Sequence, residues 1–193
     1  MGTGPRGAQG TRARTVFSPE ELPTTIELDG RLLHLNTDWR DIKRIIAILS
    51  DNRLTDRVKA SASLKIFVDN YDEIVDGQKA IEALFNFIDC GEPPANTKGM
   101  PKEMDWDVDF PAVISDMNKA AGKEIRRENY MHWFEFVAWY HAIGEGNLSY
   151  RVTIRRKLRK HEKLSPDEAD WVRRNPEKAF LERKSIDDEE DDD

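Results

Sequence analysis

Apolar residues recur at helical spacing through most of this sequence, and this pattern constrains the fold more than any other feature. Trp39, Ile42, Ile46 and Leu49 follow one another by three or four residues, with Ile45 beside them. Because an α-helix turns once every 3.6 residues, such spacing places the side chains on one face. The same pattern predicts helices near residues 39–49, 56–71, 76–90, 111–121, 127–143 and 148–163, and a short one from Ser165. The chain is therefore expected to be mainly α-helical.

Capping residues mark where several of these helices begin. One residue among Asn36, Thr37 and Asp38 is expected to cap the first helix, and Thr55 or Asp56 the second. Ser165 stands before Pro166 and two acids, which is a typical helix start. These short polar side chains accept hydrogen bonds from backbone N–H groups that the first turn leaves without partners.

Two further predictions concern residues 76–121. The helix at 76–90 is expected to bury a stripe of Ile81, Leu84, Phe85 and Ile88, with Gly91 as its C′ residue. Residues 105–110 alternate acidic with apolar side chains, which favours a short strand or an extended lead-in. Pro111 is then expected in the first turn of the next helix.

A β-hairpin signal precedes the first helix. Two β-capable stretches, residues 24–28 and 31–35, are separated by Asp29-Gly30. This dipeptide tolerates the positive φ angles of a type I′ turn. Since an isolated hairpin is only marginally stable, helices must cover one of its faces. The expected fold class is mainly α with an N-terminal β-hairpin (α+β), built as a helical bundle around a central apolar helix.

The central helix of that bundle is expected at residues 127–143, which read RENYMHWFEFVAWYHAI. Its apolar side chains point in nearly every direction. Only Glu128, His132 and Glu135 form a narrow polar stripe. A helix that is apolar on most sides is usually surrounded by the rest of its fold.

Charge and composition suggest three regions. Residues 1–21 are expected to form a flexible leader, 22–184 a single helical domain with the hairpin, and 185–193 a disordered acidic tail. The formal net charge is −7, and the seven acidic residues 187–193 account for all of it. Charged residues make up 35% of the chain and hydrophobic residues 38%, and no stretch reaches the ~20 apolar residues of a membrane span.

No residue pattern favours catalysis. His132 and Glu135 share one helix face, but no third ligand accompanies them, so they are interpreted as a polar edge. Asp105, Asp107 and Asp109 imitate the start of a calcium loop, but the required glycine and final acid are missing. Cys90 is interpreted as a half-buried structural residue. We therefore expect no enzyme, no catalytic or metal-binding residue and no cofactor.

A basic helix at residues 148–163 is the candidate partner-binding site. Its cations flank the apolar line of Ile154 and Leu158. Three alternatives stay open for this face: a solvated surface that the acidic tail can screen, a binding site for an acidic protein, and a weaker option, a nucleic-acid site. The proposed binding residues are Arg151, Arg155, Arg156, Lys157, Arg159 and Lys160.

The order of motifs resembles a bacteriophage family encoded in siphophage tail modules, between the tail-tube and tape-measure genes. The hairpin followed by LNTDWR (35–40) is similar to the family's I-N-T-D-F-R type signature. The stretches FNFIDCG (85–91), WDVDF (106–110), MHWFEF (131–136) and LSYR (148–151) resemble later family motifs. The resemblance covers about Pro23 to Leu181, and departures include tryptophan at positions 39 and 106 and the proline at 111.

The resemblance implies a tail-assembly chaperone. Such a protein binds the tape-measure protein, with the major tail-tube protein as a second partner, in the host cytoplasm while the tail is built. It is absent from the mature virion. No membrane partner is expected. Two alternatives stay open: a structural tail completion or connector protein retained in the virion, and a phage regulator that binds nucleic acid through the helix at 148–163.

Overall fold

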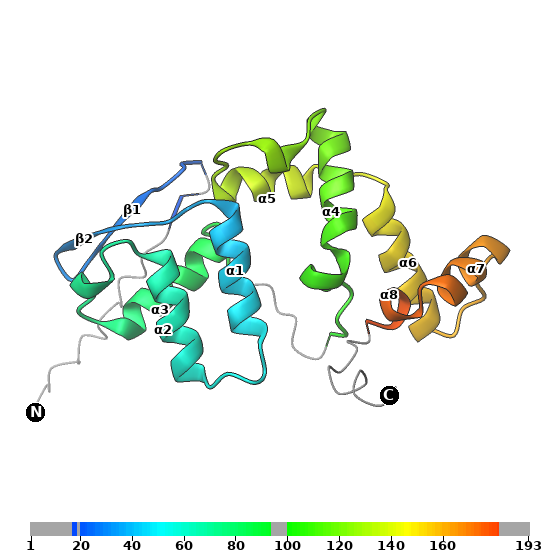
Figure 1. Ribbon diagram of the computed structural model, residues 1–193, viewed down its shortest axis with the longest axis horizontal. Coiled ribbons are helices and arrows are strands. Elements are labelled where there is room, and N and C mark those ends of the chain that lie inside the picture. Colours follow the sequence, from blue (N-terminus) through cyan, green and yellow to red (C-terminus); the bar gives the residue numbers. More distant parts are fainter. Residues whose placement is uncertain (1–16, 19, 94–99, 182–193) are drawn as a thin grey trace, which may run out of the picture. The chain divides into compact units, whose positions relative to one another are not determined.

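The computed structural model describes residues 17–18, 20–93 and 100–181. The acidic tail and most of the expected leader therefore lie outside the described residues. The chain divides into two compact units, with the boundary between Pro94 and Ala95 (Figure 1). The first contains a β-hairpin and helices α1 to α3, and the second contains α4 to α8. The predicted fold class, mainly α with an N-terminal hairpin, is confirmed, whereas the single domain at 22–184 stays a prediction.

The hairpin forms where the Asp-Gly turn predicts it. Strands β1 (Thr25–Leu28) and β2 (Arg31–His34) are antiparallel, and Ile26 lies opposite Leu33. Both of these side chains are buried. Asp29 and Gly30 have φ angles of 51° and 74°, and a type I′ turn requires positive φ at both positions. One face of the hairpin therefore contributes to the core of unit 1, as expected.

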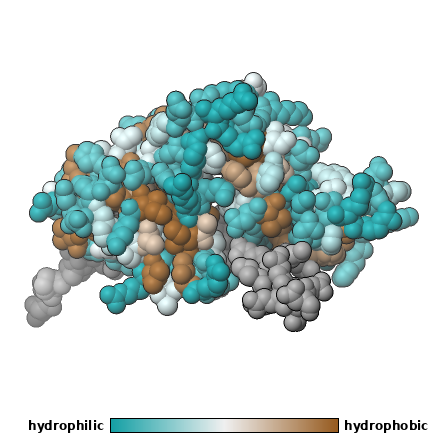
Figure 2. All heavy atoms as spheres, viewed as in Figure 1, coloured by the Kyte–Doolittle hydropathy of each residue, from teal (hydrophilic) through white to brown (hydrophobic). Residues whose placement is uncertain are grey.

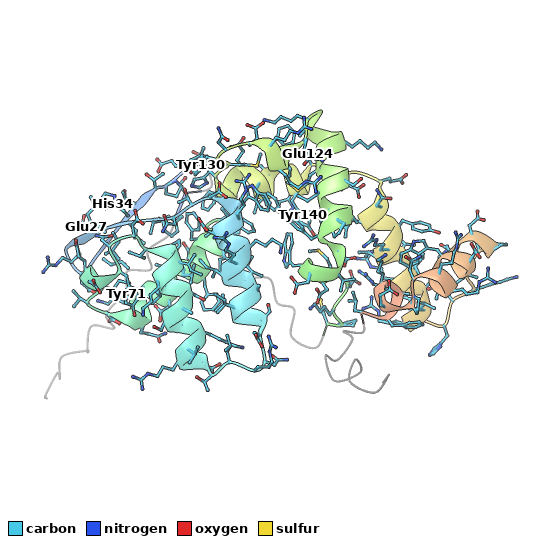
Figure 3. All side chains as sticks on the ribbon, in the orientation of Figure 1. Glu27, His34, Tyr71, Glu124, Tyr130 and Tyr140 are labelled. Carbon is cyan, nitrogen blue, oxygen red and sulfur yellow. The ribbon has the colours of Figure 1, made fainter. Side chains whose placement is uncertain are left out.

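The segment after α2 covers the outer edge of β2. The Asn70 amide bridges this edge: its nitrogen donates to the Leu32 carbonyl at 3.0 Å, and its oxygen accepts the His34 N–H at 2.9 Å. Leu35 and Val68 add an isolated antiparallel bridge. His34 and the nearby Tyr71, which begins the short helix η1 (Tyr71–Glu73), are labelled in Figure 3. The backbone groups of this edge thus have partners within unit 1.

Helices α1 (Trp39–Ser50) and α2 (Asp56–Phe67) run antiparallel and pack together (Figure 1). The predicted caps are confirmed. The Asp38 carboxylate accepts the Arg40 N–H at 2.9 Å, and the Thr55 hydroxyl accepts the Val58 N–H. The predicted apolar stripe of α1 is buried over its first half and half-buried near its C-terminal end.

The buried face of α3 (Gly77–Ile88) differs from the predicted stripe. Leu84 is buried as expected, but Phe85 is 48% exposed and Ile81 and Ile88 are only half-buried. The ring of Phe87 takes the central place instead, with the rings of Phe17 and Phe67 both 5.2 Å from it. The other buried residues of this face are Ala80 and Ala83. Phe17 comes from the expected leader, so the sequence pattern of the helix alone could not show this rotation.

The C-terminal end of α3 corrects the position of Gly91 by one residue. Cys90, with φ of 53°, is the C′ residue, and Gly91 follows it and donates to the Asn86 carbonyl at 2.8 Å. A Cβ on Gly91 would lie 2.0 Å from the carbonyl oxygen of Phe17. Glycine is needed here because the backbone of Phe17 passes directly over the helix end.

Residues 106–110 are helical, so the predicted strand or extended lead-in is wrong. Helix α4 runs over Trp106–Ala121, with Pro111 inside it rather than in its first turn. The Asp105 carboxylate starts the helix early because it accepts the N–H groups of Asp107 and Val108 at 2.8 and 3.1 Å. The alternation of acidic and apolar residues reflects this cap and buried Asp109, not a strand.

The predicted apolar helix at 127–143 is shorter in the structure. Residues Ile125–Arg127 form the short helix η2, and α5 covers only Trp133–His141. His132 is the N-cap of α5, because its ring Nδ1 accepts the Phe134 N–H at 3.1 Å. His132 is thus a buried cap and not part of an exposed polar stripe. Within unit 2, α4 packs against α5, α6 and η2 and holds the central position.

The remaining helices follow the sequence signals closely. Helix α6 covers Asn147–Arg159, α7 covers Pro166–Arg174 and α8 covers Pro176–Phe180. The Ser165 hydroxyl accepts the Glu168 N–H at 3.2 Å, and the Glu168 carboxylate accepts the Ser165 N–H at 2.7 Å. This reciprocal capping box confirms the predicted start of α7.

Candidate functional site

The cationic helix α6 begins at a carboxylate supplied by α4. Gly146 has no side chain to cap the helix, and Asp116 takes over this role by accepting the backbone N–H groups of Asn147 and Leu148 at 3.0 and 2.8 Å. A Cβ on Gly146 would lie 2.5 Å from the Asp116 carboxyl carbon. The negative charge also lies at the positive end of the helix dipole. This contact fixes the start of α6 against α4.

Arg155 is the most buried cation of the predicted site, at 3% exposed. Its guanidinium forms a two-pronged ion pair with Asp109, with N–O distances of 2.7 and 2.9 Å. The other donors reach the carbonyl oxygens of Lys178, at 2.6 and 2.9 Å, and Glu103, at 2.8 Å. All five N–H donors of the guanidinium are therefore used. Arg155 joins α4, α6 and α8 and is not available to a partner.

Arg151 lies one helical turn before Arg155 and approaches the same carboxylate. Its Nη1 lies 3.2 Å from Asp109 Oδ1 and 3.2 Å from the Val108 carbonyl oxygen. Asp109 is fully buried, and its Oδ2 also accepts the Asp105 N–H at 3.0 Å. Two guanidinium partners and a backbone donor thus offset the cost of burying this carboxylate.

Glu103, just before α4, pairs with two cations on the outer side of α6. Its Oε1 lies 2.9 Å from Arg156 Nε and 3.0 Å from Arg159 Nη2. The hydrogen bond from Arg156 is the main reason that the pKa of Glu103 is lowered, and Arg159 adds to the effect. The same hydrogen bond raises the pKa of Arg156. Because these side chains are partly exposed, each pair contributes little to stability.

The last two predicted residues behave differently. Lys157 Nζ lies 2.6 Å from Oε1 of Glu168, the residue that closes the capping box of α7, and this contact lowers the pKa of Glu168. Lys160 has a side chain that is 70% exposed and a distant partner, Glu162, at 3.9 Å. Of the six predicted cations, Lys160 has the most exposed side chain and the longest ion pair.

The structure thus places the six candidate residues on α6 and its C-cap and gives each a carboxylate partner within unit 2, with the pair of Lys160 the longest at 3.9 Å. Sequence reasoning identified the cations but missed the three carboxylates that hold them, Glu103, Asp109 and Glu168. A signal did exist: the spacing of Arg151 and Arg155 puts two guanidiniums on one helix face, and acidic residues lie just before α4 and in its first turn. Whether this face binds a partner stays a prediction, but its charges already have structural roles.

Two other reactive side chains, Tyr140 and Cys90, are partly buried. The hydroxyl of Tyr140 (Figure 3) lies 3.3 Å from Met104 Sδ, and burial raises its pKa. Burial, together with the nearby carboxylates of Asp89 and Glu92, raises the pKa of the Cys90 thiol to about 12. Within residues 17–18, 20–93 and 100–181, no three His, Cys, Asp or Glu side chains are grouped as metal ligands would be. Over the same ranges, no helix is long and apolar enough to span a bilayer.

Comparison with known proteins places the chain in a phage class. Residues 19–178, which include helices of both units, match a family of bacteriophage proteins, and the class is that of a phage structural or assembly protein. The family is the bacteriophage Gp15 protein family, and this chain belongs to it. The phage origin expected from the motif order is thereby confirmed. Neither the curated proteins nor the solved structures yielded a match.

Proposed function

We propose that this chain is a tail-assembly chaperone that binds the tape-measure protein and acts through stoichiometric binding, without catalysis. The observation that carries the proposal is the family match over residues 19–178, which agrees with the siphophage tail-module motifs of the sequence. In this role the protein works in the host cytoplasm during assembly and leaves before the virion is complete. The tail-tube protein is a second partner.

Exposed apolar side chains support a binding role. Among the described residues, large hydrophobic side chains at least one-third exposed occur in both units, and several are more than half exposed. Single exposed apolar residues are common on protein surfaces, so the number alone decides nothing. Four of them, on helices α2, α3, α6 and α8, suit a chaperone, because an amphipathic partner helix docks onto such surfaces through its apolar face. The exposed group comprises Leu22, Leu32, Val58, Val75, Phe85, Met100, Tyr130, Tyr150 and Phe180.

The paired cations of α6 favour a protein partner over nucleic acid. A nucleic-acid site needs cations that are free to neutralise phosphates. Here Arg155 and Arg151 are held by buried Asp109, and Arg156 and Arg159 share Glu103. Phosphate contacts would require these pairs to break. The nucleic-acid alternative is therefore the weaker one.

Co-expression tests the proposal directly. The cognate tape-measure protein is expressed alone, with this chain, and with an unrelated acidic helical protein of similar size as the control. We expect this chain, and not the control, to increase the soluble fraction of the tape measure and to co-purify with it. An unchanged soluble fraction, with both proteins well expressed, would overturn the proposal.

Mass spectrometry of purified virions separates the chaperone from the structural alternative. A chaperone should be present in infected-cell lysates and missing from purified particles. Recovery of this chain from particles, in a fixed ratio to the tail-tube protein, would instead identify a tail completion or connector protein.

A further inference from the structure

The helical hairpin formed by α1 and α2 has apolar residues on faces that its own core does not use. In α2, Phe67 is buried and Val58 is 48% exposed. Their separation of nine positions corresponds to two and a half helical turns, so the two side chains lie on opposite sides of the helix. Ala62, one turn after Val58, continues the outer apolar face and is only half-buried. Val58 therefore does not belong to the apolar face of α2 that packs into the core.

Helix α1 repeats this arrangement at the same end of the hairpin. Trp39 is buried, and Ile48, nine residues later and on the opposite side, is only half-buried. Leu54, in the α1–α2 loop, is also half-buried. Figure 2 shows hydrophobic side chains gathered over this end of α1 and α2. We call Ile48, Leu54 and Val58 the loop-end surface.

The hairpin that carries this surface is basic, although the whole chain is acidic. Residues 39–67 contain seven lysines and arginines and three aspartates, which gives a formal net charge of +4 in a chain of net charge −7. Asp41 and Asp51 are already paired with Arg44 and Arg53. Over the part of the chain that the structure describes, Arg57 and Lys59 form no ion pair. Both flank Val58 in sequence, so positive charge borders the apolar surface.

We infer that the loop-end surface docks an amphipathic helix of the tape-measure protein whose apolar stripe is flanked by carboxylates. The inference rests on the proposed function and names the chemistry of the partner segment. Leucine-type side chains would cover Leu54 and Val58, and flanking carboxylates would pair with Arg57 and Lys59. A second copy of this chain fits poorly, because two hairpins of net charge +4 repel each other when the same surfaces meet. A phosphate backbone would leave the apolar side chains uncovered.

Two synthetic peptides test the chemistry without the tape measure. Both are about 20 residues long, to be helical when bound, and carry the same leucine stripe. One has glutamates beside the stripe and the other has lysines. Fluorescence anisotropy with the full chain should show that the glutamate peptide binds at least about tenfold more tightly, and that added salt reduces the difference. Equal affinities, or tighter binding of the lysine peptide, would overturn the inference.

Matched variants locate the surface. The double variant Arg57→Glu/Lys59→Glu should lower the affinity for the glutamate peptide at least about tenfold, and Val58→Asp should do the same. Phe85→Asp is the control for Val58→Asp, because both native side chains are 48% exposed and Phe85 lies on α3. Arg173→Glu in α7 is the control for the charge reversal. Circular dichroism verifies that each variant is folded. Control variants that weaken binding as much as the test variants would contradict the assignment.

The same variants in the co-expression experiment separate the two proposals. If the native chain solubilises the tape measure and the double variant does not, both the chaperone function and the surface are supported. If both chains solubilise it equally, the function stands and the loop-end surface is the wrong site. If even the native chain fails, the chaperone function falls, and the peptide data alone decide whether the surface binds acidic amphipathic helices. If the chain binds duplex DNA more tightly than the glutamate peptide, the partner is nucleic acid and the inference is wrong.

Discussion

Arg155 shows how one side chain can be misread from sequence. In a run of cations it looks like a binding residue, yet the structure buries it against Asp109 with all five donors used. A buried ion pair is costly to break, because the remaining charge stays in a medium that solvates it poorly. The role of Arg155 is therefore to hold α4, α6 and α8 together.

Replacement of Arg155 by methionine should lower the free energy of unfolding by about 3–5 kcal/mol, because Asp109 loses its main partner. Lysine should restore only part of this loss, since an ammonium cannot reach the Asp109, Glu103 and Lys178 oxygens together. Arg173→Met is the matched control: its side chain is 78% exposed, and its loss should cost within about 0.5 kcal/mol. Urea unfolding followed by tryptophan fluorescence measures all three. Similar losses at positions 155 and 173 would contradict the structural role.

Cys90 should react slowly with alkylating reagents in the folded protein. Burial and the nearby carboxylates raise its thiol pKa to about 12, so almost no thiolate exists at pH 8. We expect iodoacetamide to modify Cys90 at least about tenfold more slowly in the native chain than in urea, measured by intact-mass spectrometry. Equal rates would mean that the thiol is not shielded in this way.

The start of α4 shows how a local cap decides the structure of a whole element. The alternating sequence at 105–110 resembles a strand, but the Asp105 carboxylate takes up the first free N–H groups and the helix begins at Trp106. Burial acts to raise the pKa of Asp105, yet hydrogen bonds from Lys102 and from the backbone of Val108 and Asp107 outweigh it and lower the pKa to about 2. The charged form is thus preferred in the folded state.

This shift predicts a pH dependence. A carboxylate whose pKa is lower in the folded than in the unfolded state, where it is about 3.9, stabilises the fold above pH ~4 and loses this contribution as the pH falls toward 2. Asp105→Asn keeps a capping side chain but not the charge. The stability difference between native chain and variant should be constant above pH ~5 and should shrink between pH 4 and 2 in urea titrations. A difference that does not vary with pH would show that the charge of Asp105 is unimportant.

At the scale of the whole molecule, the sequence predicts what depends on near neighbours. The hairpin turn and the caps at Asp38, Thr55 and Ser165 act within about four residues, and each was predicted correctly. The ion pairs of α6 with Asp109 and Glu103 join residues 42 to 56 positions apart, for example Arg151 with Asp109 and Arg159 with Glu103. The periodicity of apolar residues carries no information about partners so far apart in the sequence. For this reason the candidate cations could be identified, but not the carboxylates that hold them.

The native chain should bind duplex DNA weakly even at about 50 mM salt. Its net charge is −7, and all six candidate cations have carboxylate partners, five of them at 3.2 Å or less. Anisotropy of a labelled duplex measures this binding over a range of salt concentrations. Tight binding with a logarithmic salt slope near 5 would show that those pairs open readily and would restore the nucleic-acid alternative.

The contact of Phe17 with the end of α3 determines how far the chain can be shortened. From the sequence, residues 1–21 are interpreted as a flexible leader, which would favour a shortened protein that begins at Leu22. It would also remove the ring that lies 5.2 Å from Phe87 and the N–H that binds the Asn86 side chain. Trimming at that point would open the hydrophobic interior of unit 1 to water, whereas a protein that begins a few residues before Phe17 would keep it closed.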